Sequence, residues 1–261
     1  MDALQASLAV TSGSLVGFTL GLVGGGGSVL AVPLLVYLVG ITNPHVAIGT
    51  SAVAVAANAF LNLVNHGRKR NVKWRCAAVF TFAGVLGAVV GAWFGRQMDG
   101  DKLLASFAIL MMVVGGLMLR NRKGEGLPHV TLGRDNFPKL VGFGLATGLL
   151  SGFFGIGGGF LIVPGLIAAT GMPIMNAMAS SLLAVTGFGL TTSASYASAG
   201  LVNWAVAGAF VAGGLGGGLI GARVAQRVGQ KRGALNVLFA GLIFVVAAYM
   251  LARTLLPLLA K

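Results

Sequence analysis

The chain has 261 residues, of which 56% are hydrophobic and only 9% are charged. Its mean hydropathy of +0.91 leaves too little polar surface for a water-soluble globule of this length. The net charge of +13 could suggest a nucleic-acid binder, but the 18 Lys and Arg residues sit in short clusters that are not interleaved with aromatic residues. The composition therefore predicts a polytopic protein of the lipid bilayer, with no nucleic-acid partner and with basic clusters that set its topology.

The first apolar run, Ala3 to Val23, has no basic region before it and is expected to remain in the mature protein. It leads into a glycine-rich string that ends in proline, GGGGSVLAVP, at residues 24–33. A second string of this kind, GIGGGFLIVP, occupies residues 155–164. Dense glycine disrupts helices, and broken helices in apolar stretches are where transporters expose backbone to substrate. Both strings are therefore expected to break a helix at a substrate site.

The two strings belong to a longer internal repeat, because a shift of about 130 positions keeps matching residues through both halves. Thr50-Ser51 corresponds to Ser180-Ser181, and Val72-x-Trp74 corresponds to Val202-x-Trp204. Glycines also recur in unbroken spans, at Gly87/Gly91 and at 213–218, where close helix packing is the simpler interpretation.

In chain order, the first half is expected to contain a broken pair at 5–22 and 28–40 and then spans at 45–66, 75–96 and 102–120. The second half is expected to contain a broken pair at 138–153 and 159–170 and then spans at 174–197, 203–223 and 233–255. The predicted domains are a first transmembrane repeat at 1–120, a cytoplasmic linker at 121–139 and a second transmembrane repeat at 140–261. The predicted fold class is an all-α polytopic membrane protein.

Basic residues set the relative orientation of the halves. The loop that follows the span at 45–66 is rich in Lys and Arg, whereas the equivalent loop at 197–203 in the second half has no charge. The next pair of loops shows the reverse pattern. In the first half, Arg96 and Lys102 are balanced by Asp99 and Asp101, whereas the equivalent loop in the second half is basic. Corresponding loops then lie on opposite sides of the membrane. This predicts two inverted-topology repeats, each a glycine-broken re-entrant pair plus three transmembrane helices; parallel repeats with fully crossing pairs are the alternative.

The expected half-helices after the breaks, from near Ser28 and Gly159, would present free backbone N–H groups and positive dipole ends, which attract anions. All five acidic residues fall at the terminus or in expected loops: Asp2, Asp99, Asp101, Glu125 and Asp135. No buried carboxylate would therefore coordinate a cation. The sequence predicts an anion held by backbone amides at Gly25, Gly26, Gly27, Ser28, Gly157, Gly158 and Gly159.

Polar side chains inside the spans extend this predicted substrate site. The hydroxyls of Thr50, Ser51, Ser180 and Ser181 could donate to anionic oxygens or could bond back to their own helices. Asn58, Asn62 and His66 share one helix face, and their repeat equivalents are Phe188, Thr192 and Tyr196. Asn58, Asn62 and Thr192 are expected to line the cavity, with helix-to-helix hydrogen bonding as the alternative.

His66 is interpreted as the only histidine within or at the end of a span, and so as the proton-coupling candidate. Its place beside the basic loop Gly67–Arg75 favours a simpler interfacial role, and Trp74 and Trp204 are expected to anchor helix ends at the interface. Cys76 is the only cysteine, which excludes an internal disulfide and a cysteine-based metal site. No cofactor and no metal are expected.

The whole chain resembles the sulfite exporter TauE/SafE family of bacterial inner-membrane proteins. The resemblance is carried by the two glycine strings, by the elements that follow them, Gly49-Thr50-Ser51 and Ala179-Ser180-Ser181, and by the repeated Val-x-Trp motif. The resemblance implies a multi-pass secondary transporter in the cytoplasmic (inner) membrane. It also implies a small anionic substrate, namely sulfite, an organosulfonate or a related sulfur-containing anion. The second copy departs from the commoner Thr-Ser pair with Ser180-Ser181, which keeps both hydroxyls.

The leading functional hypothesis is alternating access of the two repeats around this anion site. A passive anion channel or uniporter with the same selectivity elements is the alternative. An enzyme is not expected, because no acidic residue lies in a span to orient His66. The small-residue faces at 84–92 and 213–222 could serve a homodimer as easily as internal packing.

Overall fold

The fold is a bundle of helices, and no strand occurs among the residues that the computed structural model describes, which are 2–68, 71–120, 132–155, 159–228, 241 and 243–252. The elements in chain order are α1 (Ala3–Val23), the 3₁₀-helix η1 (Gly24–Leu30), α2 (Ala31–Tyr37), α3 (Pro44–Arg68), α4 (Trp74–Gln97), α5 (Gly100–Arg120), α6 (Phe137–Phe154), α7 (Gly159–Thr170), α8 (Ile174–Ser198), α9 (Trp204–Val228) and an apolar helix at Ile243–Ala252. The expected spans between 45 and 223 match α3 to α9 closely. Most of the linker at 121–139 and part of the last expected span, 233–255, lie outside the described residues.

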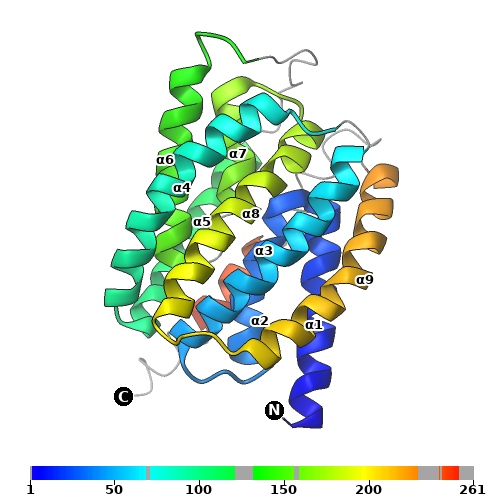
Figure 1. The fold of residues 1–261 in the computed structure, drawn as a ribbon, viewed down its shortest axis with the longest axis vertical. Helices are drawn as coiled ribbons and strands as arrows, with labels where there is room; N and C mark the ends of the chain where they lie inside the picture. The colour runs from blue at the N-terminus through cyan, green and yellow to red at the C-terminus, as the bar shows by residue number, and fades with distance from the viewer. Residues whose placement is uncertain are drawn as a thin grey trace.

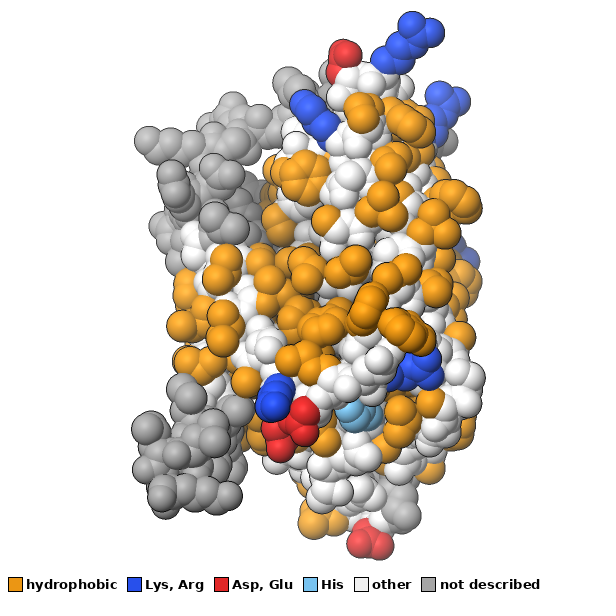
Figure 2. Space-filling view, turned by 90° about the vertical axis from the view of Figure 1, so that its left-hand side faces the viewer, with side chains coloured by type: hydrophobic (Ala, Val, Ile, Leu, Met, Phe, Trp, Pro, Cys, Tyr) orange, Lys and Arg blue, Asp and Glu red, His pale blue; other side chains and the backbone are white. Residues whose placement is uncertain are grey.

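Six described helical stretches are long and apolar enough to cross a bilayer. They are Ala3–Tyr37, Pro44–Arg68, Trp74–Gln97, Phe137–Phe154, Ile174–Ser198 and Trp204–Ala225. Large apolar side chains point outward from all six stretches, including Phe82 and Phe94 of α4, Leu149 of α6 and Ile220 of α9. Figure 2, which faces the side of the bundle where α4 and α6 lie, shows apolar side chains across the middle of that face and most of the charged side chains toward the two ends. Such a surface suits hydrocarbon on the outside of the bundle.

Each half of the chain packs its first helix against a long helix of the other half (Figure 1). Helix α1 lies against α9, and α6 lies against α4. Glycine makes both approaches close, since a Cβ on Gly17 would meet the backbone of Gly214 and a Cβ on Gly148 would meet the backbone of Gly84. Successive contacts advance in the same direction along both partners, so each of these pairs is parallel.

Most of the other glycines of these faces also pack inside the chain, although a Cβ at Gly216 would have open space. Gly87 and Gly91 face the backbone of α6, and Gly213 and Gly217 face the backbone of α1. The close-packing interpretation of these glycines is therefore confirmed. The same contacts account for much of the small-residue faces at 84–92 and 213–222.

Helices α3 and α8 cross at the centre of the bundle (Figure 1). Gly49, near the start of α3, lies against Tyr196, near the end of α8, and Gly189 of α8 lies against Ala56 of α3. The two helices are therefore antiparallel. Trp74 and Trp204 begin α4 and α9 and are 51% and 64% exposed, as residues that anchor helix ends at a membrane interface would be.

The first glycine string ends the α-helix, as predicted, but the second part of the pair differs from the prediction. Residues Gly24–Leu30 form the buried 3₁₀-helix η1, which continues directly into α2. A 3₁₀-helix bonds each N–H to the carbonyl three residues back, so this part of the break has backbone hydrogen bonds of its own. The α-helix expected at 28–40 therefore spans only Ala31–Tyr37. In the second half, α7 begins at Gly159 as predicted.

Candidate functional site

The two glycine breaks meet inside the bundle. Helices α1 and α6 end at equivalent glycines, Gly24 and Gly155, both at φ 66°, a backbone conformation that glycine adopts without penalty. An added Cβ on Gly25 would lie 3.1 Å from the Cα of Gly159, and one on Gly159 would overlap the carbonyl of Gly25. Backbone therefore touches backbone where the first string passes the second. Gly157 and Gly158 lie outside the described residues.

The breaks also contact the helices that follow them in the opposite half. Gly24 lies against the backbone of Met178 in α8, and Gly155 lies against the side chain of Ile48 in α3. Met178 and Ile48 are repeat equivalents. Each break is therefore held by the start of the helix that follows the other break.

Ser181 makes a direct polar contact with the first string. The backbone N–H of Gly25 donates to Ser181 Oγ at 3.0 Å, and that hydroxyl donates to the carbonyl of Met178 at 2.7 Å. The equivalent Ser51 donates to the carbonyl of Ile48 at 2.8 Å. Both hydroxyls thus bond back to their own helices, one of the two options that the sequence left open. Because η1 starts at Gly24, the N–H groups that find no carbonyl inside η1 are those of Gly24–Gly26, a group that begins one residue before the predicted Gly25–Ser28. The N–H of Gly25 is the one that Ser181 satisfies.

Thr50 and Ser180 lie beside these serines and accept hydrogen bonds from loops. Thr50 Oγ1 accepts a hydrogen bond from the backbone N–H of Asn203 at 2.9 Å, and Ser180 Oγ accepts one from the N–H of Lys73 at 2.9 Å. Both hydroxyls are fully buried. These two predicted site residues therefore connect each half to a loop of the other.

Asn58, Asn62 and His66 share one face of α3, as the spacing predicts, and all three are buried. Asn58 packs against Gly214 and Asn62 against Gly218, both on α9. Asn62 Nδ2 donates back to the carbonyl of Asn58 at 2.9 Å. His45 lies in the first turn of α3, so the interpretation of His66 as the only histidine at the end of a span is wrong.

Several buried polar atoms near the breaks and on α3 and α8 have no hydrogen-bond partner among the described residues. They include both amide atoms of Asn58, Ser28 Oγ, Ser151 Oγ and Thr192 Oγ1. Asn58, Ser28, Ser151 and Thr192 are all completely buried. Unpaired polar atoms in a protein interior are costly and commonly mark the place of water, an ion or a ligand. Asn58, Ser28 and Thr192 were predicted from the sequence.

Sequence reasoning missed Thr19 and Ser151. Thr19 Oγ1 lies within hydrogen-bond distance of the carbonyl of Gly27, at 3.2 Å, and so touches the first string from α1. Ser151 lies in the last turn of α6, four residues before Gly155. Each is the last hydroxyl of the apolar helix that leads into a glycine break, and that position was the available signal.

The described carboxylates all lie away from the site around Gly25 and Gly159. The four acidic residues that the structure describes are Asp2, Asp99, Asp101 and Asp135, and all of them are exposed. Within the described part of the chain, the site around Gly25 and Gly159 therefore contains hydroxyls, amides and backbone N–H groups but no carboxylate. Such a donor set suits an anion better than a cation.

The family model described as "Sulfite exporter TauE/SafE" matches residues 9–250, almost the whole chain. The chain belongs to the sulfite exporter TauE/SafE family. Among its relatives, a "Probable membrane transporter protein" of Xylella fastidiosa is 51% identical over 258 residues, which cover 97% of this chain and 98% of that protein. "Probable membrane transporter protein YunE" of Bacillus subtilis is 28% identical over 226 residues, 78% of this chain and 82% of its own. No solved structure matches the chain significantly.

Membership of the TauE/SafE family confirms the resemblance stated from the paired glycine strings. Together with the six apolar spans, it makes the protein a multi-pass membrane protein of the bacterial inner membrane. The relatives carry the names of membrane transporters, so this chain is a member of a membrane transporter family.

Proposed function

We propose that the protein is a secondary transporter that moves sulfite, organosulfonates or related sulfur-containing anions across the cytoplasmic membrane. The observation that carries this proposal is the contact between Gly25 and Gly159, where the two glycine breaks meet beside buried hydroxyls and amides. Irregular backbone is tolerated at membrane depth where it is enclosed by protein or lines a wet cavity, and transporters use such places for substrate.

The proposed substrate site lies between the breaks and the polar face of α3. Its members are the amides at Gly25, Gly26, Gly27, Ser28 and Gly157–Gly159, the side chains of Thr50, Ser51, Asn58, Asn62, Ser180, Ser181 and Thr192, and the newly found hydroxyls of Thr19 and Ser151. Asn58 is the strongest side-chain candidate, because its amide could both donate to an oxyanion and accept from a protonated one. His66 remains the proposed proton-coupling residue.

We propose alternating access of two inverted-topology repeats, residues 1–120 and 140–261, as the mechanism. The antiparallel crossing of the equivalent helices α3 and α8 supports opposite orientations of the repeats. Re-entrant pairs are supported by Figure 1, in which α2 returns toward the end of the bundle where α1 begins. The contact of α1 with α9 is the repeat equivalent of the contact of α6 with α4. The outward-open and inward-open states would therefore have equivalent helix packing. The lipid bilayer surrounds this unit, and a homodimer stays a prediction.

Flux of radiolabelled sulfite into proteoliposomes tests the function, with and without an imposed pH gradient and with sulfate, sulfoacetate and taurine as competitors. We expect accumulation above equilibrium when the gradient is present. Gly159→Val, which places a side chain against the carbonyl of Gly25, should abolish flux, whereas Gly142→Val should not, because a Cβ at Gly142 has open space. Wild-type flux in Gly159→Val would reject the site.

A passive anion channel is the second candidate. The observation that favours it is the exposure of every described carboxylate, which leaves no acidic group in the described spans to carry a coupled proton. Protein-dependent flux that only equilibrates, whatever the pH gradient, would select the channel over the coupled transporter.

A further inference from the structure

Three polar side chains outside the proposed central site converge at one end of the bundle, where α3 begins and α4 and α8 end. They are His45 of α3, Arg96 of α4 and Tyr196 of α8. Arg96 Nη1 donates to the carbonyl of Ser195 at 2.9 Å, which fixes the guanidinium beside Tyr196. The rings of His45 and Tyr196 lie with their centroids 6.3 Å apart.

Each of the three side chains has a buried polar atom that lacks a hydrogen-bond partner among the described residues. These atoms are His45 Nδ1, Arg96 Nε and Tyr196 Oη. Tyr196 is 0% exposed, and Arg96 makes no ion pair within the part of the chain that the structure describes. A permanently charged guanidinium with an unused donor, next to a buried phenol, is an incomplete arrangement that an oxyanion would complete.

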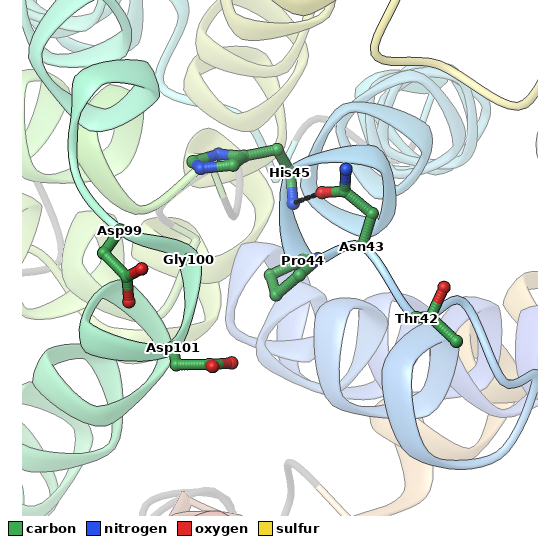
Figure 3. A pocket seen from close by; sticks show the side chains of 7 residues that line it. All are labelled: Thr42, Asn43, Pro44, His45, Asp99, Gly100 and Asp101. Atoms are coloured by element: carbon green, nitrogen blue, oxygen red, sulfur yellow. Dashed lines mark hydrogen bonds between the residues drawn. The ribbon is translucent and has the colours of Figure 1, made fainter.

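A surface pocket of about 330 Å³ reaches His45 from outside. Figure 3 shows the imidazole extending from α3 toward the turn that carries Asp99, while the backbone N–H of His45 donates to Asn43 Oδ1 at 2.9 Å. Asp99 and Asp101 also line this pocket, and both carboxylates are exposed. Their negative charge opposes anion binding in this outer pocket.

We propose that Arg96, Tyr196 and His45 form a second oxyanion-binding site, through which the substrate enters or leaves the central site. This inference rests on the proposed function and deepens it. The site lies at the opposite end of α4 from Arg75, away from the basic loop at 68–75. Arg96 supplies the charge, Tyr196 a hydroxyl donor and His45 a contact with the surface pocket. The ligand class is a small sulfur oxyanion such as sulfite.

Equilibrium dialysis of the purified full chain with radiolabelled sulfite tests this site by its stoichiometry. We expect two sulfite ions for each wild-type chain, one for Arg96→Gln, one for Asn58→Leu, in which the central site is altered, and none for the double variant. Tyr196→Phe should weaken the second site about fivefold, because it removes one hydrogen-bond donor. Asp99→Asn should strengthen it.

Arg75→Gln is the matched control, since it makes the same change of charge in an exposed arginine at the other end of α4. It should bind as wild type does. Arg96→Lys should restore part of the binding lost in Arg96→Gln, and thermal denaturation should show that Tyr196→Phe is folded, because its hydroxyl has no partner to lose.

The outcomes separate the two proposals. If Arg96→Gln and Tyr196→Phe bind two sulfite ions with wild-type affinity, the second site is rejected and the transport function stands. If Asn58→Leu keeps two while Arg96→Gln keeps one, the second site stands and the central site as proposed around Asn58 is rejected. If the wild-type chain binds none of sulfite, sulfate, sulfoacetate or taurine, both are rejected.

Discussion

Thr50 Oγ1, in the first half of the chain, accepts a 2.9 Å hydrogen bond from the backbone N–H of Asn203 in the second half. The relation is reciprocal, because Ser180 accepts from Lys73 at the same distance. A loop N–H at each end of the bundle is thus satisfied by a hydroxyl of the other half.

Replacing Thr50 with valine keeps the shape of the side chain but removes the acceptor. We expect the free energy of unfolding to fall by about 1–2 kcal/mol, because the N–H of Asn203 loses its partner in a partly buried place. Thr50→Ser should retain wild-type stability. Thermal unfolding in detergent measures both; equal midpoints for valine and wild type would show that the bond contributes nothing.

The parallel pair of α4 and α6 should be sensitive to side-chain size at Gly148. Gly148→Leu places a side chain where the backbone of Gly84 lies, and we expect a loss of about 3 kcal/mol or failure to fold. Gly142→Leu, on the same helix, points into open space and should be neutral. Yield of monodisperse protein and its melting temperature compare the two; similar behaviour would contradict the packing described for this pair.

Asn58 should show opposite effects on stability and function. Its amide is buried and has no partner among the described residues, so Asn58→Leu should leave stability unchanged or raise it by about 1 kcal/mol. The same variant should lose sulfite binding at the central site. Melting curves and equilibrium dialysis measure the two effects on one preparation, and a strongly destabilised variant would mean that the amide is already satisfied.

Ser181 and Ser51 are repeat equivalents that should differ. Ser181→Ala leaves the N–H of Gly25 without its acceptor and should cost about 1–2 kcal/mol, with weaker sulfite binding. Among the described contacts, Ser51 bonds only to its own helix, so Ser51→Ala should change stability by less than about 0.5 kcal/mol. Equal losses in the two variants would argue that the first string does not depend on Ser181.

Apolar composition, together with the glycine and proline residues that interrupt the apolar stretches, was enough to predict the long helices. Helix α8 was expected at 174–197 and spans Ile174–Ser198. The conformation of Gly24–Leu30 could not be predicted in this way, because four successive glycines carry no side chain whose pattern reports a turn. That conformation depends on contacts with Ser181 and Gly159, which lie far away in the sequence.

Some polar residues of the candidate sites could likewise be predicted from the sequence, and others could not. Asn58, Asn62 and His66 were visible because a four-residue spacing placed them on one face. Thr19 and Ser151 are single hydroxyls, and Arg96 looked like a loop charge balanced by Asp99. Only the fold brings Arg96 beside Ser195 and Tyr196.

The glycine-lined contacts of α1 with α9 and of α4 with α6 each join one helix from either half of the gene. Two helices whose backbones touch along their length move as one body. Any large motion of the protein would then divide the molecule between these mixed pairs, across the central α3 and α8, instead of at the boundary between the repeats. Alternating access of the two repeats would then proceed through these mixed pairs, each of which contains one helix of either repeat.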